Sequence, residues 1–213
     1  MKNHNSGNTG FMALKLDMSK AYDRVEWSFL KAMMIQMGFN DWWVALIMEC
    51  ISSVTYPLLI NGEPFGEIKL SRGIRQSDPL SPYLFLFCSE GLHRMIQKAA
   101  DRGDIQVVSI CHNGPKLTHL FFADNSLLFC KSTIHNCQKV MDILSSYEAV
   151  SSQKLNRDKT ALFFSKSTLG DMQRQIMEIL GVTELKQNEE YLGLPVMVGR
   201  NKRESFDHLK QKI

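Results

Sequence analysis

Alternating apolar and polar residues predict short strands along the chain. The segment FMALKLD, residues 11–17, sends Met12, Leu14 and Leu16 to one side and its odd-numbered residues to the other, which is the period of a strand. The last residue of this segment is an acid, Asp17. We therefore expect a strand with one apolar face that ends at a carboxylate.

Apolar residues at helical spacing lie between the predicted strands. The segment EWSFLKAMMIQMG has this spacing and stops at Gly38, a residue type that commonly ends helices. A longer helix is expected with Ser81 as its N-cap, Pro82 at its first helical position and its end at Gly103. Three further helices are predicted, one after Asp41 and the others over residues 135–150 and 168–182.

Tight turns between apolar runs predict hairpins. Asn61-Gly62 separates two apolar stretches, a strong short-range hairpin signal, and the segment LTHLFFADNSLLFC, residues 117–130, predicts a second one. Further strands are expected at residues 160–166 and 191–199. Hairpins among alternating helices and strands favour an α+β fold with a mainly antiparallel sheet flanked by helices, rather than a doubly wound parallel sheet.

Composition and charge exclude few classes of protein. The chain has 213 residues, 44% hydrophobic and 22% charged, which suits a single globular domain. A net charge of +3 is compatible with a polyanionic partner but too small to indicate one. The polar start MKNHNSGNTG and the lack of any run of about 18 apolar residues argue against a secretory signal and a membrane span. We expect the cytoplasm or nucleus, not secretion.

The five cysteines predict free thiols rather than disulfides. Their number is odd, there is no C-x-x-C pair, and most lie in apolar surroundings such as FLFC and LLFC. Cys130, His135 and Cys137 lack a fourth ligand at a standard spacing, which argues against a zinc site.

Two acids, Asp17 and Asp124, stand at the edges of apolar strands, where an unpaired carboxylate is costly. Each has an ordinary structural explanation. Asp17 could cap a following helix, and Asp124-Asn125 could fill the two central positions of a tight hairpin. Single residues do not decide between these explanations and a catalytic site.

Asp17 and Asp124 belong to a series of five sequence blocks, which together indicate a protein family. In order, the chain reads LDMSKAYDRVEW, RGIRQSDPLSPYLF, LFFADNSLLFC, LNRDKTALFFSK and YLGLPV. These blocks span most of the chain, which resembles the reverse transcriptase domain of non-LTR (LINE-type) retrotransposons, above all those of plants. The resemblance implies a polymerase palm from which most of the fingers and the thumb are missing. It also implies RNA-directed DNA synthesis with Mg²⁺ or Mn²⁺, dNTPs, an RNA template and a DNA primer.

The resemblance also implies roles for particular residues. Asp17 and Asp124 match metal-binding aspartates, and the Met18 carbonyl would face a metal. Two hard cations would stabilise the oxygens that attack and leave the α-phosphorus. Lys159 matches a lysine proposed to protonate the leaving pyrophosphate, although a phosphate contact or a surface lysine stays open.

Further matches concern the nucleotide and the primer. Tyr22 matches the aromatic that selects deoxyribonucleotides, with core packing as the alternative, and Gln76 matches a residue along the incoming nucleotide. Arg75 either assists there or is a solvated surface side chain. The segment that resembles the primer grip comprises Tyr191, Leu192 and Gly193. The basic residues that follow suit phosphates or a solvated helix face; they are Arg200, Lys202, Arg203, Lys210 and Lys212.

Three departures from the family pattern predict an impaired enzyme. The family reads F-A-D-D where this chain has Asn125, and an amide is a neutral, weaker ligand for a hard cation. Ser77 and Ser152 stand where relatives have glycine, whose backbone freedom a turn there could need. Each change is one G-to-A step in a codon, which suggests a decayed element. The alternatives are a nucleic-acid-binding palm without catalysis, and a remnant that binds only protein or has no role.

Overall fold

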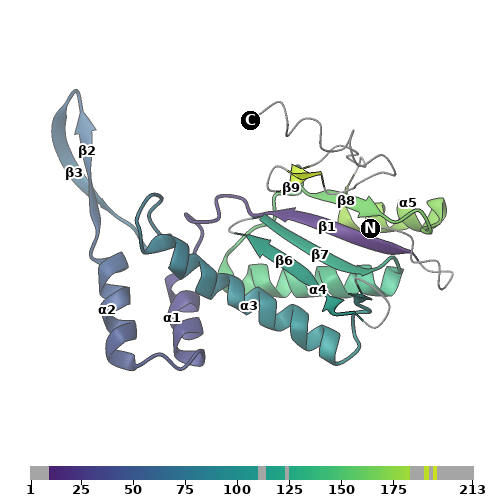
Figure 1. Cartoon of the computed structure of the whole chain (residues 1–213). Helices are drawn as coiled ribbons and strands as arrows, with labels where there is room; N and C mark the ends of the chain where they lie inside the picture. Colours follow the sequence, from purple (N-terminus) through teal and green to yellow (C-terminus); the bar gives the residue numbers. More distant parts are fainter. Residues whose placement is uncertain (1–9, 110–113, 123–124, 183–189, 192–193, 196–213) are drawn as a thin grey trace, which may run out of the picture. The chain divides into compact units, whose positions relative to one another are not determined.

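The computed structural model describes residues 10–109, 114–122, 125–182, 190–191 and 194–195. Helices and strands alternate along this part of the chain (Figure 1). In chain order the elements are β1 (Phe11–Asp17), α1 (Trp27–Gln36), α2 (Asp41–Ser52), β2 (Thr55–Ile60), β3 (Glu63–Lys69), α3 (Ser81–Asp101), β4 (Val108–Ser109), β5 (Lys116–Leu117), β6 (His119–Phe122), β7 (Asn125–Lys131), α4 (Ile134–Ser151), β8 (Ala161–Phe164), α5 (Gly170–Leu180), β9 (Glu190–Tyr191) and β10 (Leu194–Pro195).

The chain divides into two compact units, and neither is a continuous segment. The sheet unit comprises residues 1–17, 96–142 and 155–213, and the helical unit comprises residues 18–95 and 143–154. The chain therefore passes from the sheet unit into the helical unit immediately after Asp17.

The sheet unit is built on four strands in the order β6-β7-β1-β8, all paired antiparallel (Figure 1). β1 is central, and its side chains Met12, Leu14 and Leu16 are each at most 2% exposed. On the opposite face, Ala13 packs with Phe163 in a second apolar cluster. The predicted α+β fold with a mainly antiparallel sheet is confirmed, as is the predicted division of β1 into two faces.

The helical unit contains α1, α2 and the β2–β3 hairpin. Helix α2 is capped by Asn40, whose side-chain oxygen accepts a hydrogen bond from the Trp42 N–H at 2.8 Å. The hairpin turns at Asn61 and Gly62, with φ of 53° and 86°, the left-handed geometry expected of an Asn-Gly turn. Its strands expose several large apolar side chains, among them Leu58, Leu59, Ile60, Phe65 and Ile68.

Two boundary predictions need correction. Helix α3 begins one residue earlier than its predicted cap implies, because the Leu84 N–H donates to the Leu80 carbonyl, which makes Leu80 rather than Ser81 the capping position. Asn125 is also not a central turn residue. It is the first residue of β7 and pairs directly with Phe122 of β6. The turn explanation therefore does not account for an asparagine at position 125.

The four cysteines of the described chain are free thiols, as predicted; Cys88, Cys130 and Cys137 are buried, whereas Cys50 is exposed. Cys111 lies outside the described residues. Burial raises the pKa of Cys88 and of Cys130 to about 12, from the ordinary 9.0. These thiols therefore stay protonated in the folded chain over the range in which they ionise in the unfolded chain.

Thiol labelling should follow this burial. In a Cys111→Ser background at pH 8 we expect an aromatic disulfide reagent to modify Cys50 at once and the other three thiols only after unfolding, because the thiolate is the reactive form. The pKa of Cys88 and of Cys130 is higher in the folded chain than in the unfolded chain. The stability that comes from burying these neutral thiols is therefore complete below about pH 9 and is lost as the pH rises towards 12. Rapid labelling of Cys88 in the folded chain would contradict the burial.

No helix in the described part of the chain is long and apolar enough to cross a membrane.

Candidate active site

Asp17 and Asn125 face each other across neighbouring strands of the sheet unit. They are register partners in the antiparallel β1–β7 pair, so their side chains leave the same face of the sheet with Cβ atoms roughly 5 Å apart. Lys159 reaches the same place, with its Nζ 4.0 Å from Asp17 Oδ1. The Asp17 side chain is 20% exposed and that of Lys159 is 68% exposed, so solvent reaches the pair. Residues far apart in the sequence therefore meet at the end of the central strand.

Asn156 connects Asp17 to the turn that carries Lys159. The Asn156 N–H donates to the Asp17 carbonyl at 2.9 Å, which continues the pairing of β1 beyond its last strand residue. The Asn156 side-chain oxygen accepts from the Lys159 N–H at 3.3 Å, and its carbonyl accepts from Thr160. Sequence reasoning missed this role, although asparagine is a residue type that favours turns because its side chain bonds nearby backbone groups.

The donor set at this position suits a hard cation only in part. Carboxylate and amide oxygens are the ligands that magnesium prefers, and Asp17 and Asn125 present one of each. Asp124, the second predicted metal ligand, lies outside the described residues, and Met18 is described with a buried side chain. Within the described residues, no group of three or more His, Cys, Asp or Glu could hold a metal ion. Asn125 contributes no charge, so Asp17 is the only acidic side chain on β1 and β7.

The predicted nucleotide-binding residues come together in the helical unit. The Tyr22 carbonyl accepts from the Ile74 N–H at 2.9 Å, and the Val25 carbonyl accepts from the Gly73 N–H at 2.8 Å. These bonds hold the segment after Asp17 against the segment that continues into Arg75, Gln76 and Ser77. Tyr22 and the segment that leads into Arg75, Gln76 and Ser77 are therefore neighbours.

The ring of Tyr22 is held in a defined orientation. It stacks on Phe85 of α3, with the ring centroids 5.3 Å apart and the planes 9° from parallel. Tyr22 remains half-buried rather than enclosed in the core, so one part of the side chain stays accessible. This geometry suits an aromatic that presents a fixed edge to a ligand.

Gly73 is needed where these two segments meet. Its φ is +89°, and a Cβ at this position would lie 2.9 Å from the Asp23 carbonyl oxygen. The Gly73 carbonyl also accepts from Trp27 Nε1 at 2.7 Å. The close approach of Asp23 explains why a residue without a side chain is required here.

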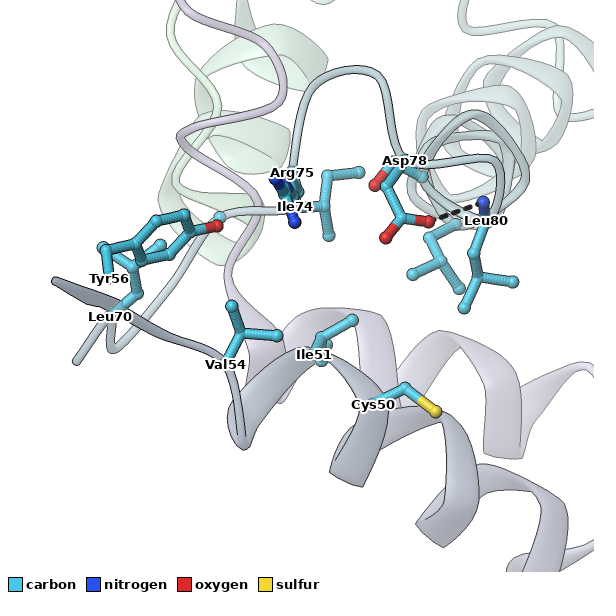
Figure 2. Close-up of a pocket in the computed structure, with 12 residues that line it drawn as sticks. Cys50, Ile51, Val54, Tyr56, Leu70, Ile74, Arg75, Asp78 and Leu80 are labelled. Carbon is cyan, nitrogen blue, oxygen red and sulfur yellow. Dashed lines mark hydrogen bonds between the residues drawn. The ribbon is translucent and has the colours of Figure 1, made fainter. Parts of the chain in front are cut away.

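Arg75 and Asp78 line a hollow beside the predicted nucleotide residues (Figure 2). Apolar side chains such as Ile51 and Val54 form much of the remaining wall. Asp78 has a structural role, because its Oδ1 accepts from the Leu80 N–H at 2.8 Å and so helps to begin α3. Arg75, Gln76 and Ser77 are all exposed, which leaves both of the open explanations for Arg75 in place.

Ser77 and Ser152 both adopt the left-handed backbone conformation, with φ of 68° and 58°. These are two of the positions at which the family pattern has glycine, and the positive φ supplies the physical reason. A side chain in this conformation costs about 1–2 kcal/mol, because Cβ crowds the following carbonyl. The chain therefore carries strain at both positions.

Restoring glycine at these positions should stabilise the fold. We expect Ser77→Gly and Ser152→Gly each to raise the free energy of unfolding by about 0.5–1 kcal/mol, the relieved strain less the added entropy of the unfolded chain. Urea denaturation measures the effect. Ser28→Gly, in an exposed position of the first turn of α1, is the control and should lower stability slightly, by roughly 0.5 kcal/mol or less. Losses in all three variants would show that neither serine is strained.

The segment that resembles the primer grip is described only in part. Tyr191 lies in β9 and pairs with Leu194 of β10, whereas Leu192, Gly193 and the predicted basic tail lie outside the described residues. The roles predicted for this segment stay predictions.

An antiparallel sheet with an acid at the end of its central strand is the core expected of a polymerase palm, and comparison with known proteins narrows the class. A family model described as reverse transcriptase (RNA-dependent DNA polymerase) matches residues 2–196. The chain belongs to this family.

Two relatives refine the family. The chain is 44% identical over 68 residues to an uncharacterized mitochondrial protein of Arabidopsis thaliana, which covers 32% of the chain and 56% of that protein. It is 27% identical over 118 residues to the retrovirus-related Pol polyprotein from the type-1 retrotransposable element R2 of Popillia japonica, covering 55% of the chain but 18% of the polyprotein. The chain thus spans about half of the first relative and under a fifth of the second. These matches confirm a reverse transcriptase domain of the non-LTR retrotransposon type.

Solved structures confirm the fold. The chain is similar to telomerase from Candida albicans, solved in complex with a fragment of telomeric RNA, with a TM-score of 0.60 over 87% of this chain and 29% of that one. The sequences are 16% identical over this match, so the similarity concerns the fold alone.

Proposed function

We propose that this chain carries the nucleotidyl transfer site of an RNA-directed DNA polymerase, and that Asn125 leaves the site severely impaired. The placement of Asn125 opposite Asp17, with Lys159 Nζ 4.0 Å from the Asp17 carboxylate, carries the proposal. A carboxylate at position 125 would lie on the face of the sheet where the family binds its metals. The neutral amide keeps the size of that ligand and loses its charge.

The cation site would comprise Asp17, Asp124 and the Met18 carbonyl, with Mg²⁺ or Mn²⁺ as the ion. Divalent cations at such a site stabilise the attacking and leaving oxygens of a phosphoryl transfer. Lys159 would bind or protonate the pyrophosphate, because its exposed ammonium group lies beside Asp17 on a turn fixed by Asn156. In the absence of substrate, the same ammonium group offsets part of the Asp17 charge.

The helical unit would bind the nucleotide. Tyr22 would exclude the ribose 2′-hydroxyl, since its ring is fixed against Phe85, and Gln76 with Arg75 would contact the dNTP. The partners would be an RNA template and a DNA primer, which family membership and the fold shared with an RNA-bound telomerase support.

Removal of the acid on β1 tests the site. In an Asn125→Asp background, Asp17→Asn should abolish primer extension on an RNA template, because it removes the anionic ligand of β1. Glu63→Gln removes a carboxylate from the exposed hairpin and should leave extension unchanged. Extension that survives Asp17→Asn would refute the proposed site.

A nucleic-acid-binding palm without catalysis is the second candidate, and the neutral side chain at Asn125 favours it. This function predicts that the chain binds an RNA–DNA hybrid with an affinity that falls steeply with salt. It also predicts no extension by either the natural chain or Asn125→Asp.

A further inference from the structure

The turn that follows α4 clamps the segment that carries Tyr22. The Gln153 side chain is 1% exposed, and its Nε2 donates to the Ala21 carbonyl at 2.9 Å, across 132 residues of sequence. The neighbouring Lys154 carbonyl accepts from the Ser19 N–H at 2.8 Å. Two bonds from consecutive residues of the turn therefore hold the chain immediately before Tyr22.

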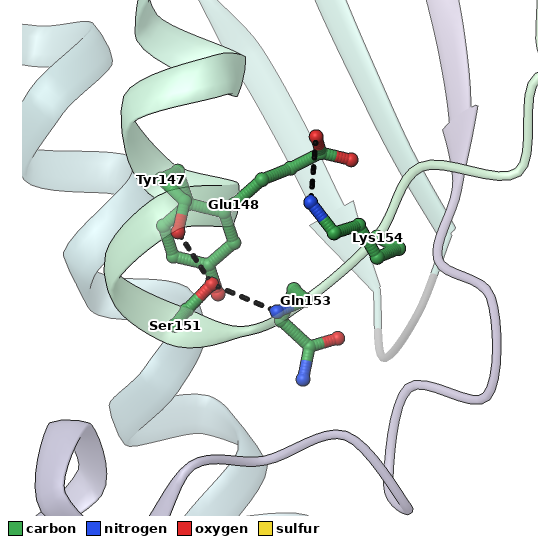
Figure 3. A network of polar contacts seen from close by, with 5 residues as sticks. All are labelled: Tyr147, Glu148, Ser151, Gln153 and Lys154. Atoms are coloured by element: carbon green, nitrogen blue, oxygen red, sulfur yellow. Dashed lines mark hydrogen bonds and ion pairs between the residues drawn. The ribbon is translucent and has the colours of Figure 1, made fainter.

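The turn is itself firmly supported (Figure 3). Ser151 Oγ donates to the Tyr147 carbonyl at 2.6 Å and accepts from the Gln153 N–H at 3.2 Å. Lys154 pairs with Glu148 at 3.4 Å. The Tyr147 hydroxyl donates to the Cys88 carbonyl at 3.2 Å, which ties this end of α4 to α3, and burial raises the pKa of Tyr147 above its ordinary value. Gln153 thus projects from a fixed support.

The Gln153 amide destabilises the fold through one of its atoms, so filling space in the core does not explain why an amide is present. Its Oε1 is buried without a hydrogen-bond partner among the described residues. A buried acceptor in this state is destabilising, and a methionine would fill the same volume without that cost. The bond that the amide makes, from Nε2 to Ala21, is the gain that an apolar side chain would not provide.

We propose that Gln153 is a positioning residue that fixes the Ala21 carbonyl and, through it, Tyr22. Tyr22 follows Ala21 directly, its carbonyl receives the Ile74 N–H, and its ring lies on Phe85. A shift of Ala21 would move the ring and the segment leading to Gln76 together. The consequence for nucleotide selection rests on the proposed function of Tyr22; the positioning itself does not.

Hydrogen–deuterium exchange of the whole chain tests the positioning. Gln153→Met keeps the side-chain volume and removes the donor, and Gln138→Met, at an exposed position of α4, is the matched control. Exchange in a peptide covering residues 18–24 should rise about five- to tenfold in Gln153→Met, as expected for the loss of one buried hydrogen bond, while a peptide from α1 keeps its rate. Unchanged exchange over residues 18–24, or an equal rise throughout the chain, would overturn the proposal.

Nucleotide selection separates this proposal from the proposed function. In an Asn125→Asp background, Gln153→Met should reduce the preference for dATP over ATP about five- to tenfold, with a larger change in KM than in kcat. Tyr22→Ala is the reference and should reduce the preference further. If Tyr22→Ala leaves the preference unchanged, the function proposed for Tyr22 fails, while the exchange result still decides whether Gln153 holds the segment.

Discussion

Asn125→Asp should raise DNA synthesis on an RNA template by at least about 10- to 100-fold. Loss of groups that merely support metal ligands already reduces metal affinity or activity by about this factor, and a charge facing the metals should matter at least as much. The register places position 125 directly opposite Asp17, so the new carboxylate would join the acid that β1 already supplies. The fold should tolerate the change, because Asn125 is partly exposed and the two side chains have nearly the same shape.

Primer extension with Mg²⁺ or Mn²⁺ measures this effect. Asn40→Asp is the matched control, since it adds the same charge at the N-cap of α2, where aspartate caps as well as asparagine. Both variants should also be assayed within a longer non-LTR polymerase, because the chain spans 18% of the R2 polyprotein. Equal extension by the natural chain and Asn125→Asp in that setting would show that the missing carboxylate is not what limits activity.

Gly73→Ala should be the most destabilising of the substitutions considered, at about 2–4 kcal/mol. A left-handed conformation costs alanine about 1–2 kcal/mol, and the added Cβ would also lie 2.9 Å from the Asp23 carbonyl oxygen, which is backbone and cannot rotate away. Relief of this contact would pull Gly73 away from Val25 and Trp27, whose bonds join the Tyr22 segment to the one that leads into Gln76.

Gly38→Ala provides the control for the conformational part of this cost. Gly38 has a φ of +84°, close to that of Gly73, but a Cβ there would meet nothing within 4 Å. We expect it to lose about 1–2 kcal/mol, so that the difference between the variants measures the clash with Asp23. Urea denaturation gives both values, and equal losses would mean that the Asp23 contact relaxes without cost.

The strain at Ser77 and Ser152 agrees with the hypothesis of a decaying element. Asn125 places a neutral side chain opposite Asp17 in a strand that keeps its pairing, whereas the two serines add left-handed strain. The three departures thus separate into one that bears on the proposed chemistry and two that bear on stability. Codons that need changes other than G to A would contradict the common origin.

Local patterns determined much of this protein in advance. The period of residues 11–17 determined the faces of β1, Asn61-Gly62 determined a hairpin, and the ordered blocks identified the family and its matched residues. These signals are short in range, because they depend on φ preferences and on which side of one strand a residue faces.

Long-range contacts were decided only by the tertiary structure. The register that sets Asn125 opposite Asp17, the bond by which Gln153 reaches Ala21, and the approach of Asp23 to Gly73 join residues from distant parts of the chain. No local preference encodes such pairs, because strand register and loop placement follow from the packing of the whole chain. The sequence by itself predicted which residues a polymerase palm would need, and the tertiary structure decided which of them meet and which residues hold them there.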